Sequence, residues 1–123
     1  MNPPLRLLLV EDHVPTNTTL ASLLGAEHTV FSATTAAQAL ELARAHPLDV
    51  VIADIGLPDR TGWDVLREIR KMQPEVHAIA LTGVDYAEDP HRFSEAGFEM
   101  HLPKPVELSK IKSAIQTLCP DRA

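Results

Sequence analysis

Short apolar runs alternate along the whole chain with longer segments in which apolar residues recur three or four positions apart. The runs are rich in Leu, Val and Ile, and their length is typical of β-strands. We therefore predict five strands, over residues 5–10, 29–32, 50–53, 76–81 and 98–102.

The segments between the strands predict helices, because residues three and four apart lie on the same face of a helix. This spacing indicates helices around residues 20–24, 36–43, 65–69 and 108–118. A further helix is expected within 84–97, where apolar positions are few. Pro90 suits its first turn and Gly97 its carboxyl end, so that much of 83–89 is expected to be loop.

The alternation of strands and helices indicates the fold class. Helices that connect successive parallel strands cross over in a right-handed sense and cover both faces of the sheet. Strands covered in this way are largely apolar, as the runs at 5–10 and 50–53 are. We expect an α/β fold with a doubly wound, five-stranded parallel sheet and five helices. A length of 123 residues fits one domain over 1–123.

The charge and the cysteine content exclude several classes of function. With 11 basic and 17 acidic residues the net charge is −6, so the chain has no general attraction for nucleic acid or an anionic membrane. The run at 5–10 is too short for a membrane span or a signal sequence. The single cysteine, Cys119, cannot form an internal disulfide, which suits a reducing compartment. We expect a cytoplasmic domain that neither binds nucleic acid directly nor inserts into a membrane.

Polar side chains stand at the carboxyl ends of four predicted strands. Glu11 and Asp12 follow the first strand, and Asp54 follows the third. The fourth strand is followed by Thr82, and Lys104 comes soon after the fifth. Loops and helix amino ends converge at this edge of a parallel sheet, so ligands collect there. We therefore expect these five side chains to form one site.

Three carboxylates gathered at one edge require a cation. One pair of unit charges 4 Å apart repels by roughly 4 kcal/mol at an effective dielectric of 20. Carboxylate oxygens without His or Cys suit Mg²⁺, which keeps several waters and often binds a phosphate oxygen. Thr82, as a hydrogen-bond donor, and Lys104, as a fixed positive charge, could hold other phosphoryl oxygens. Asp54 then remains as the group that attacks phosphorus.

Four motifs stand in order at the strand ends. They are the acid pair at 11–12, DIGLPDRTG at 54–62, ALTG at 80–83 and LPKPV at 102–106. Together they resemble the receiver domain of two-component response regulators, and the resemblance covers essentially the whole chain. It implies a flavodoxin-like receiver fold and a role in phosphorelay signalling. In that role Asp54 would accept a phosphoryl group from a phosphohistidine, and partner binding would change.

The resemblance implies a metal site built on four residues. Asp12 and Asp54, together with the backbone carbonyl of Gly56, would bind Mg²⁺, which Mn²⁺ could replace. Glu11 would act through a metal-bound water. The site would therefore combine two direct carboxylate ligands with one main-chain oxygen.

Further roles follow from the same resemblance. Thr82 and Lys104 would contact the phosphoryl group and report its presence. Pro58 would anchor the loop after the third strand, Gly62 would open the next helix, and Pro105 would join the fifth strand to the last helix. These residues would support the site without taking part in the transfer.

The resemblance also implies partners. The phosphodonor would be a histidine kinase or a histidine phosphotransfer protein, and a weak homodimer is a further partner to expect. The run AGFEMHLPKPV at 96–106 looks most like receivers fused to hybrid histidine kinases. Such a domain would not be an enzyme in the usual sense, since it catalyses only its own phosphoryl transfer and autodephosphorylation.

Two residues depart from the family pattern. Gly83 stands where receivers commonly carry Ala, which removes a methyl group beside the site and favours a looser loop and faster exchange with water. His101 stands where Tyr or Phe is usual, three residues before Lys104. We favour a partly buried packing role for His101 over a role as a pH or phosphorylation switch.

Other interpretations of these residues remain open. Asp54 could be a loop or helix-capping acid, and Glu11 and Asp12 could cap the first helix. A phosphatase of the haloacid dehalogenase-like class requires a second acid where Gly56 stands, and a flavin phosphate would be repelled by the acid pair. A pseudo-receiver that binds proteins without being phosphorylated is the remaining alternative, and it need not bind Mg²⁺. Trp63 is expected to pack in the core.

Overall fold

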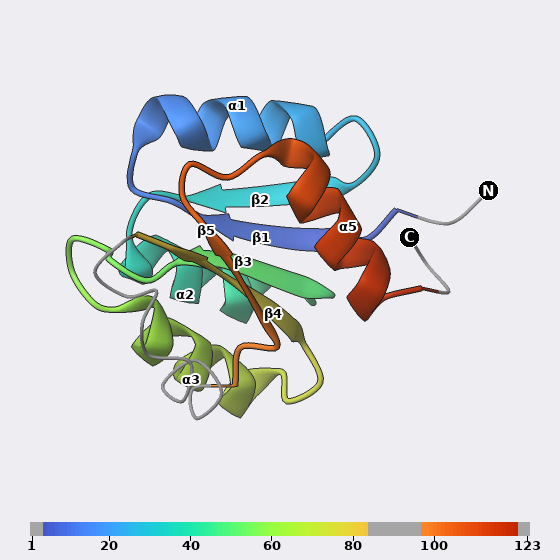
Figure 1. The fold of residues 1–123 in the computed structure, drawn as a ribbon. Coiled ribbons are helices and arrows are strands. Elements are labelled where there is room, and N and C mark those ends of the chain that lie inside the picture. Colours follow the sequence, from blue (N-terminus) through green and yellow to red (C-terminus); the bar gives the residue numbers. More distant parts are fainter. Residues whose placement is uncertain (1–3, 84–96, 121–123) are drawn as a thin grey trace.

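The structure is a computed structural model that describes residues 4–83 and 97–120 (Figure 1). The strands are β1 (Arg6–Val10), β2 (Thr29–Ala33), β3 (Val50–Asp54), β4 (His77–Thr82) and β5 (Met100–Pro103). The helices are α1 (Val14–Leu24), α2 (Ala36–Ala45), α3 (Gly62–Met72) and α5 (Leu108–Leu118). The predicted helix within 84–97 lies outside the described residues, apart from Gly97, which has a positive φ of 96°.

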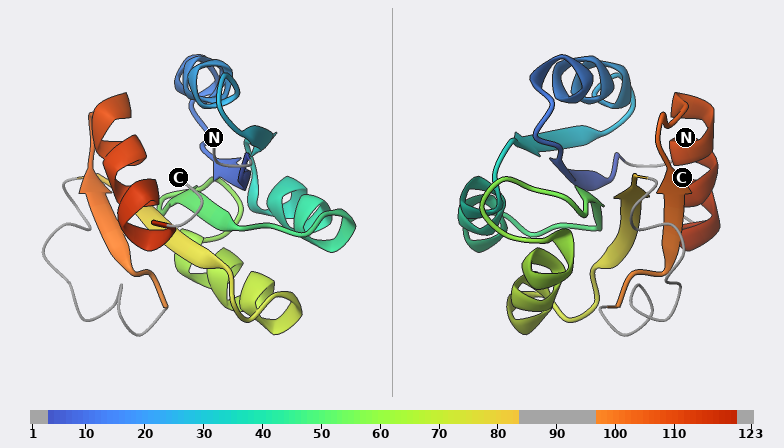
Figure 2. Two further views of the ribbon diagram at one scale, coloured as in Figure 1. Left: turned by 90° about the vertical axis from the view of Figure 1, so that its right-hand side faces the viewer. Right: turned by 60° about the vertical axis from the view of Figure 1, so that its left-hand side comes forward.

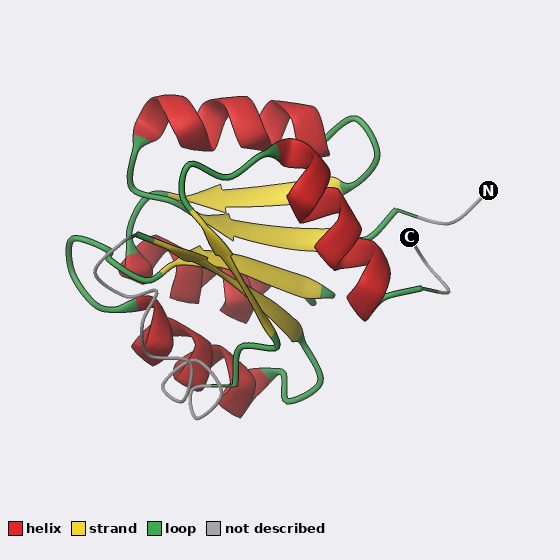
Figure 3. Ribbon diagram, in the orientation of Figure 1, coloured by secondary structure: helices red, strands yellow, loops and turns green. Residues whose placement is uncertain are grey.

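All five strands are parallel and form one sheet in the order β2-β1-β3-β4-β5. Helices cover both faces of this sheet (Figures 2 and 3). Buried side chains of α1 and α5 pack on one face, and those of α2 and α3 pack on the other. The doubly wound α/β fold is therefore confirmed. No helix in the described part of the chain is long and apolar enough to cross a membrane.

Alternation along the strands explains the two cores. In β1, Leu7 and Leu9 belong to the core under α1 and α5, whereas Leu8 and Val10 belong to the core under α2 and α3. Successive side chains of a strand point to opposite faces, so a strand covered on both sides must be apolar at every position. Trp63 is 5% exposed and packs in the core with α2 and α3, as predicted.

The strand limits differ slightly from those predicted, most clearly at the last strand. The apolar run predicts a strand over 98–102, but β5 begins at Met100 and ends at Pro103. Phe98 is 6% exposed and packs in the core although it precedes the strand. An apolar side chain indicates burial and not backbone hydrogen bonding, so the predicted strand began two residues before the observed one.

The register of the sheet brings the polar strand ends together. Val10 of β1 is paired with Ala53 of β3, so the acid pair after β1 lies beside the end of β3. Asp54 is paired with Leu81 of β4. The next residue of β4, Thr82, is paired with the last residue of β5, immediately before Lys104. The expected meeting of these residues at one edge therefore follows from strand pairing.

Close backbone packing explains the glycine at the start of α3. Thr61 caps this helix by accepting a hydrogen bond from the Asp64 amide at 3.2 Å. The amide of Gly62 donates to the Ile55 carbonyl at 2.8 Å. A Cβ at Gly62 would collide with the Asp54 carbonyl oxygen and would lie 3.0 Å from the Ile55 Cα. Gly62 opens α3, as predicted, and only a residue without a side chain fits there.

Gly62→Ala should therefore destabilise the protein, because the backbone after β3 must move to make room. We expect the free energy of unfolding in urea to fall by about 1–3 kcal/mol. Gly83→Ala is the matched control, since an added Cβ there meets no atom of residues 4–83 and 97–120 within 4 Å. Equal stability of the two variants would contradict the packing argument.

Candidate functional site

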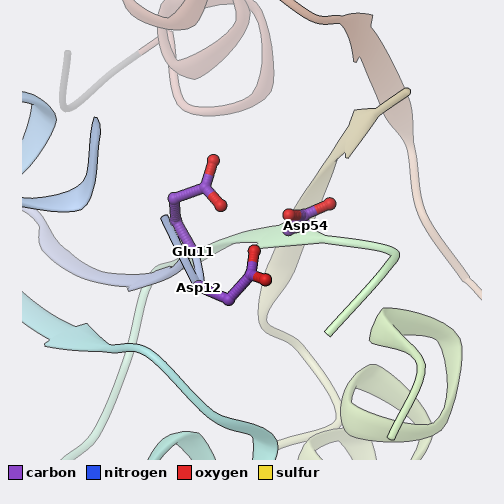
Figure 4. Close-up of side chains that lie close together, drawn as sticks. All are labelled: Glu11, Asp12 and Asp54. Atoms are coloured by element: carbon purple, nitrogen blue, oxygen red, sulfur yellow. The ribbon is translucent and has the colours of Figure 1, made fainter. Parts of the chain in front are cut away.

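Three carboxylates meet at the carboxyl end of the sheet. One carboxylate oxygen from each of Glu11, Asp12 and Asp54 lies within 4.8 Å of the other two (Figure 4). Glu11 is 1% exposed and Asp54 is 5% exposed, whereas Asp12 is exposed. Two of the acids are therefore shielded from the water that would weaken their repulsion.

Lys104 provides the positive charge among these acids. Its Nζ lies 2.6 Å from Asp54 Oδ2 and 3.0 Å from Glu11 Oε1. The lysine is held in place by its own backbone amide, which donates to the Thr82 carbonyl at 2.8 Å. The peptide bond that joins it to Pro105 is cis. One ammonium group thus bridges the ends of β1 and β3 from the end of β5.

The surroundings shift the proton equilibria of this pair. Burial raises the pKa of Asp54 to about 6, opposed by the hydrogen bond from Lys104 and reinforced by the nearby Glu11. Burial lowers the pKa of Lys104, but its contacts with Asp54 and Glu11 outweigh burial and raise that pKa above the usual value. At neutral pH the site therefore holds an ionised Asp54 beside a protonated lysine.

A buried amide that the sequence analysis missed holds the acid pair. The Nδ2 group of Asn17, in α1, donates to the Glu11 carbonyl at 3.0 Å and to the Ala33 carbonyl at 2.9 Å. Asn17 is 5% exposed. The Glu11 amide donates to the same Ala33 carbonyl at 3.0 Å, and the His13 amide donates to Glu11 Oε2 at 3.2 Å. A polar residue at a core-facing position of α1 was the available signal.

The loop after β3 is tied to α2 by a second residue that the sequence analysis did not single out. Asp59 Oδ1 accepts from the Ala36 amide at 2.9 Å, and Oδ2 accepts from the Ala37 amide at 3.0 Å. These hydrogen bonds, that from Ala36 first, lower the pKa of Asp59. Gly56, in the same loop, donates its amide to Asp54 Oδ1 at 3.2 Å. The loop therefore contacts both the buried acid and a neighbouring helix.

The other predicted site residues lie around this cluster. Thr82 is 1% exposed, and its hydroxyl donates to the Leu102 carbonyl at 3.4 Å. Gly83 follows it directly, whereas Pro58 and Pro105 are exposed in the loops after β3 and β5. His101 is exposed, so its expected partial burial is wrong. The residue lies on β5, which is at the edge of the described sheet and pairs with β4 on one side.

Helix capping does not account for the acids. Thr61, not Asp54, caps α3, and the cap residue of α1 is His13 rather than Glu11 or Asp12. The donor set of three carboxylates, two of them buried, fits a hard divalent cation such as Mg²⁺. Among the described residues no other group of three His, Cys, Asp or Glu side chains comes together in this way.

Comparison with known proteins gives one consistent result. Residues 7–116 match the family model of the response regulator receiver domain. The sensor histidine kinase RcsC of Escherichia coli strain K12 is 30% identical over 115 residues. This alignment covers 93% of the present chain and 12% of RcsC, so the chain spans a small part of that relative.

Solved structures share the fold. The receiver domain protein of Clostridium thermocellum superposes with a TM-score of 0.86 at 27% identity, covering 94% of both chains. A further match comes from the co-crystal of the Saccharomyces cerevisiae histidine phosphotransfer protein Ypd1 with the receiver domain of Ssk1. It has a TM-score of 0.87 and 23% identity and covers 100% of this chain and 94% of that one, which shows similarity of fold.

The buried Asp54 should make stability depend on pH. A folded-state pKa of about 6, above the ordinary value of 3.8 for Asp, favours the folded state when Asp54 is protonated, and this contribution is lost as the pH rises through about 6. Asp54→Asn does not titrate. As the pH rises from 4.5 to 7.5, the free energy of unfolding of Asp54→Asn should therefore increase by about 1–3 kcal/mol relative to that of the native protein.

Urea unfolding of both proteins at the two pH values measures this difference. Added Mg²⁺ should stabilise the native protein at pH 7.5 and leave Asp54→Asn nearly unchanged, because ligand binding stabilises the state that binds. A stability difference that is the same at both pH values would show that Asp54 carries no burial penalty.

Proposed function

The chain belongs to the response regulator receiver domain family, and we propose that it accepts a phosphoryl group on Asp54 from a phosphohistidine. The observation that carries this proposal is the contact of the Lys104 ammonium with a buried Asp54, at 2.6 Å, within a cluster of three carboxylates. A structural salt bridge would need one acid. Two additional acids beside it favour a site that binds a further cation and, through it, a phosphate.

The transfer is a nucleophilic substitution at phosphorus. An Asp54 carboxylate oxygen forms a bond to phosphorus while the bond from phosphorus to the histidine nitrogen breaks, and the imidazole leaves with the electron pair. β3 holds Asp54 at its end, where five parallel residue pairs with β4 fix the backbone. The carboxylate is ionised at neutral pH and therefore available for attack.

The metal and two side chains would stabilise the transferred group. Asp12, Asp54 and the Gly56 carbonyl would hold Mg²⁺, which would neutralise negative charge on the phosphoryl oxygens. Glu11, which forms an ion pair with Lys104, would contact the metal through a metal-bound water. Lys104 would then pass from the Asp54 carboxylate to a phosphoryl oxygen, since its ammonium already lies beside the attacking group.

Thr82 would report the transfer. Its hydroxyl donates to the Leu102 carbonyl in the present structure, so donation to a phosphoryl oxygen would require that bond to be given up. The change would reach β5, which carries His101 on its exposed side. If the phosphoryl group binds one conformation of Thr82 and β5 more tightly than another, phosphorylation shifts the balance between them and so alters the affinity for a partner.

The partners in this proposal are proteins that carry a phosphohistidine. The similarity to a segment of a sensor histidine kinase and to a receiver solved with a histidine phosphotransfer protein supports this assignment. We place the domain in the cytoplasm, free of nucleic acid and membrane, with autodephosphorylation as its only further chemistry. A weak homodimer is part of the same expectation.

Intact mass tests the proposed function. Incubation with Mg²⁺ and acetyl phosphate should add one phosphoryl group to the native protein, and chelation of Mg²⁺ should prevent the addition. Asp54→Asn should gain no mass, and Asp64→Asn, which changes a half-buried acid of α3 paired with Arg67, is the matched control that should label normally. An unlabelled native protein, beside a reactive control receiver, would instead favour the pseudo-receiver alternative.

Lys104 should compete with the metal. Lys104→Met removes the cation that now balances Glu11 and Asp54, so isothermal titration should show Mg²⁺ binding about three- to tenfold tighter at pH 7.5. Lys112→Met removes a half-buried lysine of α5 that pairs with Glu27 at 3.3 Å and should leave Mg²⁺ affinity unchanged. Weaker Mg²⁺ binding by Lys104→Met would show that the lysine supports the metal site instead.

A further inference from the structure

Asp59 joins the loop after Asp54 to α2, a helix that is distant in sequence but adjacent in space. Its two carboxylate oxygens accept hydrogen bonds from the amides of Ala36 and Ala37, the first two residues of α2, at 2.9 and 3.0 Å. The cap residue of that helix, Thr35, accepts from the Gln38 amide at 3.2 Å. Asp59 thus supplies acceptors for amides that the helix's own cap does not reach.

The same short segment also holds the acid pair. The carbonyl of Ala33, at the end of β2, accepts from the Glu11 amide and from the Asn17 side chain, at 3.0 and 2.9 Å. Residues 33–37 therefore contact the site on two sides. One end fixes the residues after β1, and the other end fixes the loop after β3 through Asp59.

The loop between β3 and α3 has an anchor at its base and another near its tip. At the base, Gly56 forms an antiparallel bridge with Thr61. Near the tip, Asp59 is bound to α2, and Leu57 packs half-buried against the core. Gly56, whose carbonyl is the predicted third metal ligand, is part of the base anchor and lies three residues before Asp59. Loss of the Asp59 contacts would leave the tip held by the Leu57 side chain and by the hydrogen bond from the Leu57 amide to the Ile55 carbonyl at 3.2 Å.

We propose that Asp59 is a positioning residue for phosphorylation, which fixes the loop that carries Gly56 by binding the amino end of α2. This inference rests on the proposed function of Asp54. Asp59 itself does not touch the carboxylate cluster. Its removal should leave every predicted metal ligand in the chain but should allow the Gly56 carbonyl to move, which lowers metal affinity.

Mg²⁺ titration and acetyl phosphate labelling test this role. We expect Asp59→Ala to weaken Mg²⁺ binding by about tenfold and to slow labelling at low Mg²⁺, with the rate restored at saturating Mg²⁺. Asp59→Asn keeps one acceptor oxygen and should be intermediate. Thr35→Ala is the matched control, because it removes a cap from the same helix end whose hydroxyl accepts a hydrogen bond from within α2, from the Gln38 amide.

The outcomes separate the two proposals. If the native protein labels and Asp59→Ala binds Mg²⁺ as tightly as Thr35→Ala does, Asp59 is a helix cap and the positioning role is wrong. Slower labelling of Asp59→Ala at every Mg²⁺ concentration, with unchanged affinity, would also contradict it. If the native protein neither binds Mg²⁺ nor labels, the function proposed for Asp54 fails and the positioning role fails with it.

Discussion

The contact of one lysine with two buried carboxylates governs the site. Without a cation, the negative charges of Glu11 and Asp54 would repel strongly at 1% and 5% exposure, because water does not screen their repulsion there. Lys104 supplies that charge from β5, the strand at the far edge of the sheet from β2. The site is therefore stable without a metal, yet it keeps an exposed third acid, Asp12, through which a metal could enter.

The fold serves to hold charges of like sign close together. The register of β1, β3 and β4 places the carboxyl ends of these strands side by side. The two apolar cores fix the sheet between its helices. Two side chains that bind backbone groups do the finer positioning. Asn17 joins the ends of β1 and β2, and Asp59 joins the loop after β3 to α2. Both residues act on main-chain atoms, so they position the site without adding a group to it.

The sequence predicted most of this architecture because its information is local. Apolar runs locate the strands, helical spacing locates the helices, and residues at the ends of parallel strands must lie on one edge. That reasoning was sufficient to place Glu11, Asp12 and Asp54 together. It also gave the correct environment for Trp63, which lies at a core-facing position at the start of α3.

The features that the sequence did not predict depend on contacts between distant segments. Asn17 bonds a carbonyl 16 residues away and Asp59 an amide 23 residues away, and no short pattern encodes such pairs. The exposure of His101 depends on the position of β5 at an edge, which follows from strand order. The simultaneous contact of Lys104 with two acids depends in the same way on the register of three strands.

A crystal structure of the protein with Mg²⁺ would test the central claim most directly. The account predicts an ion at about 2.0–2.1 Å from oxygens of Asp12, Asp54 and the Gly56 backbone. Lys104 should be displaced from the Asp54 oxygen that binds the ion. An ion bound elsewhere, with Lys104 still between Glu11 and Asp54, would show that the carboxylates form a closed structural salt bridge and not a metal-dependent phosphorylation site.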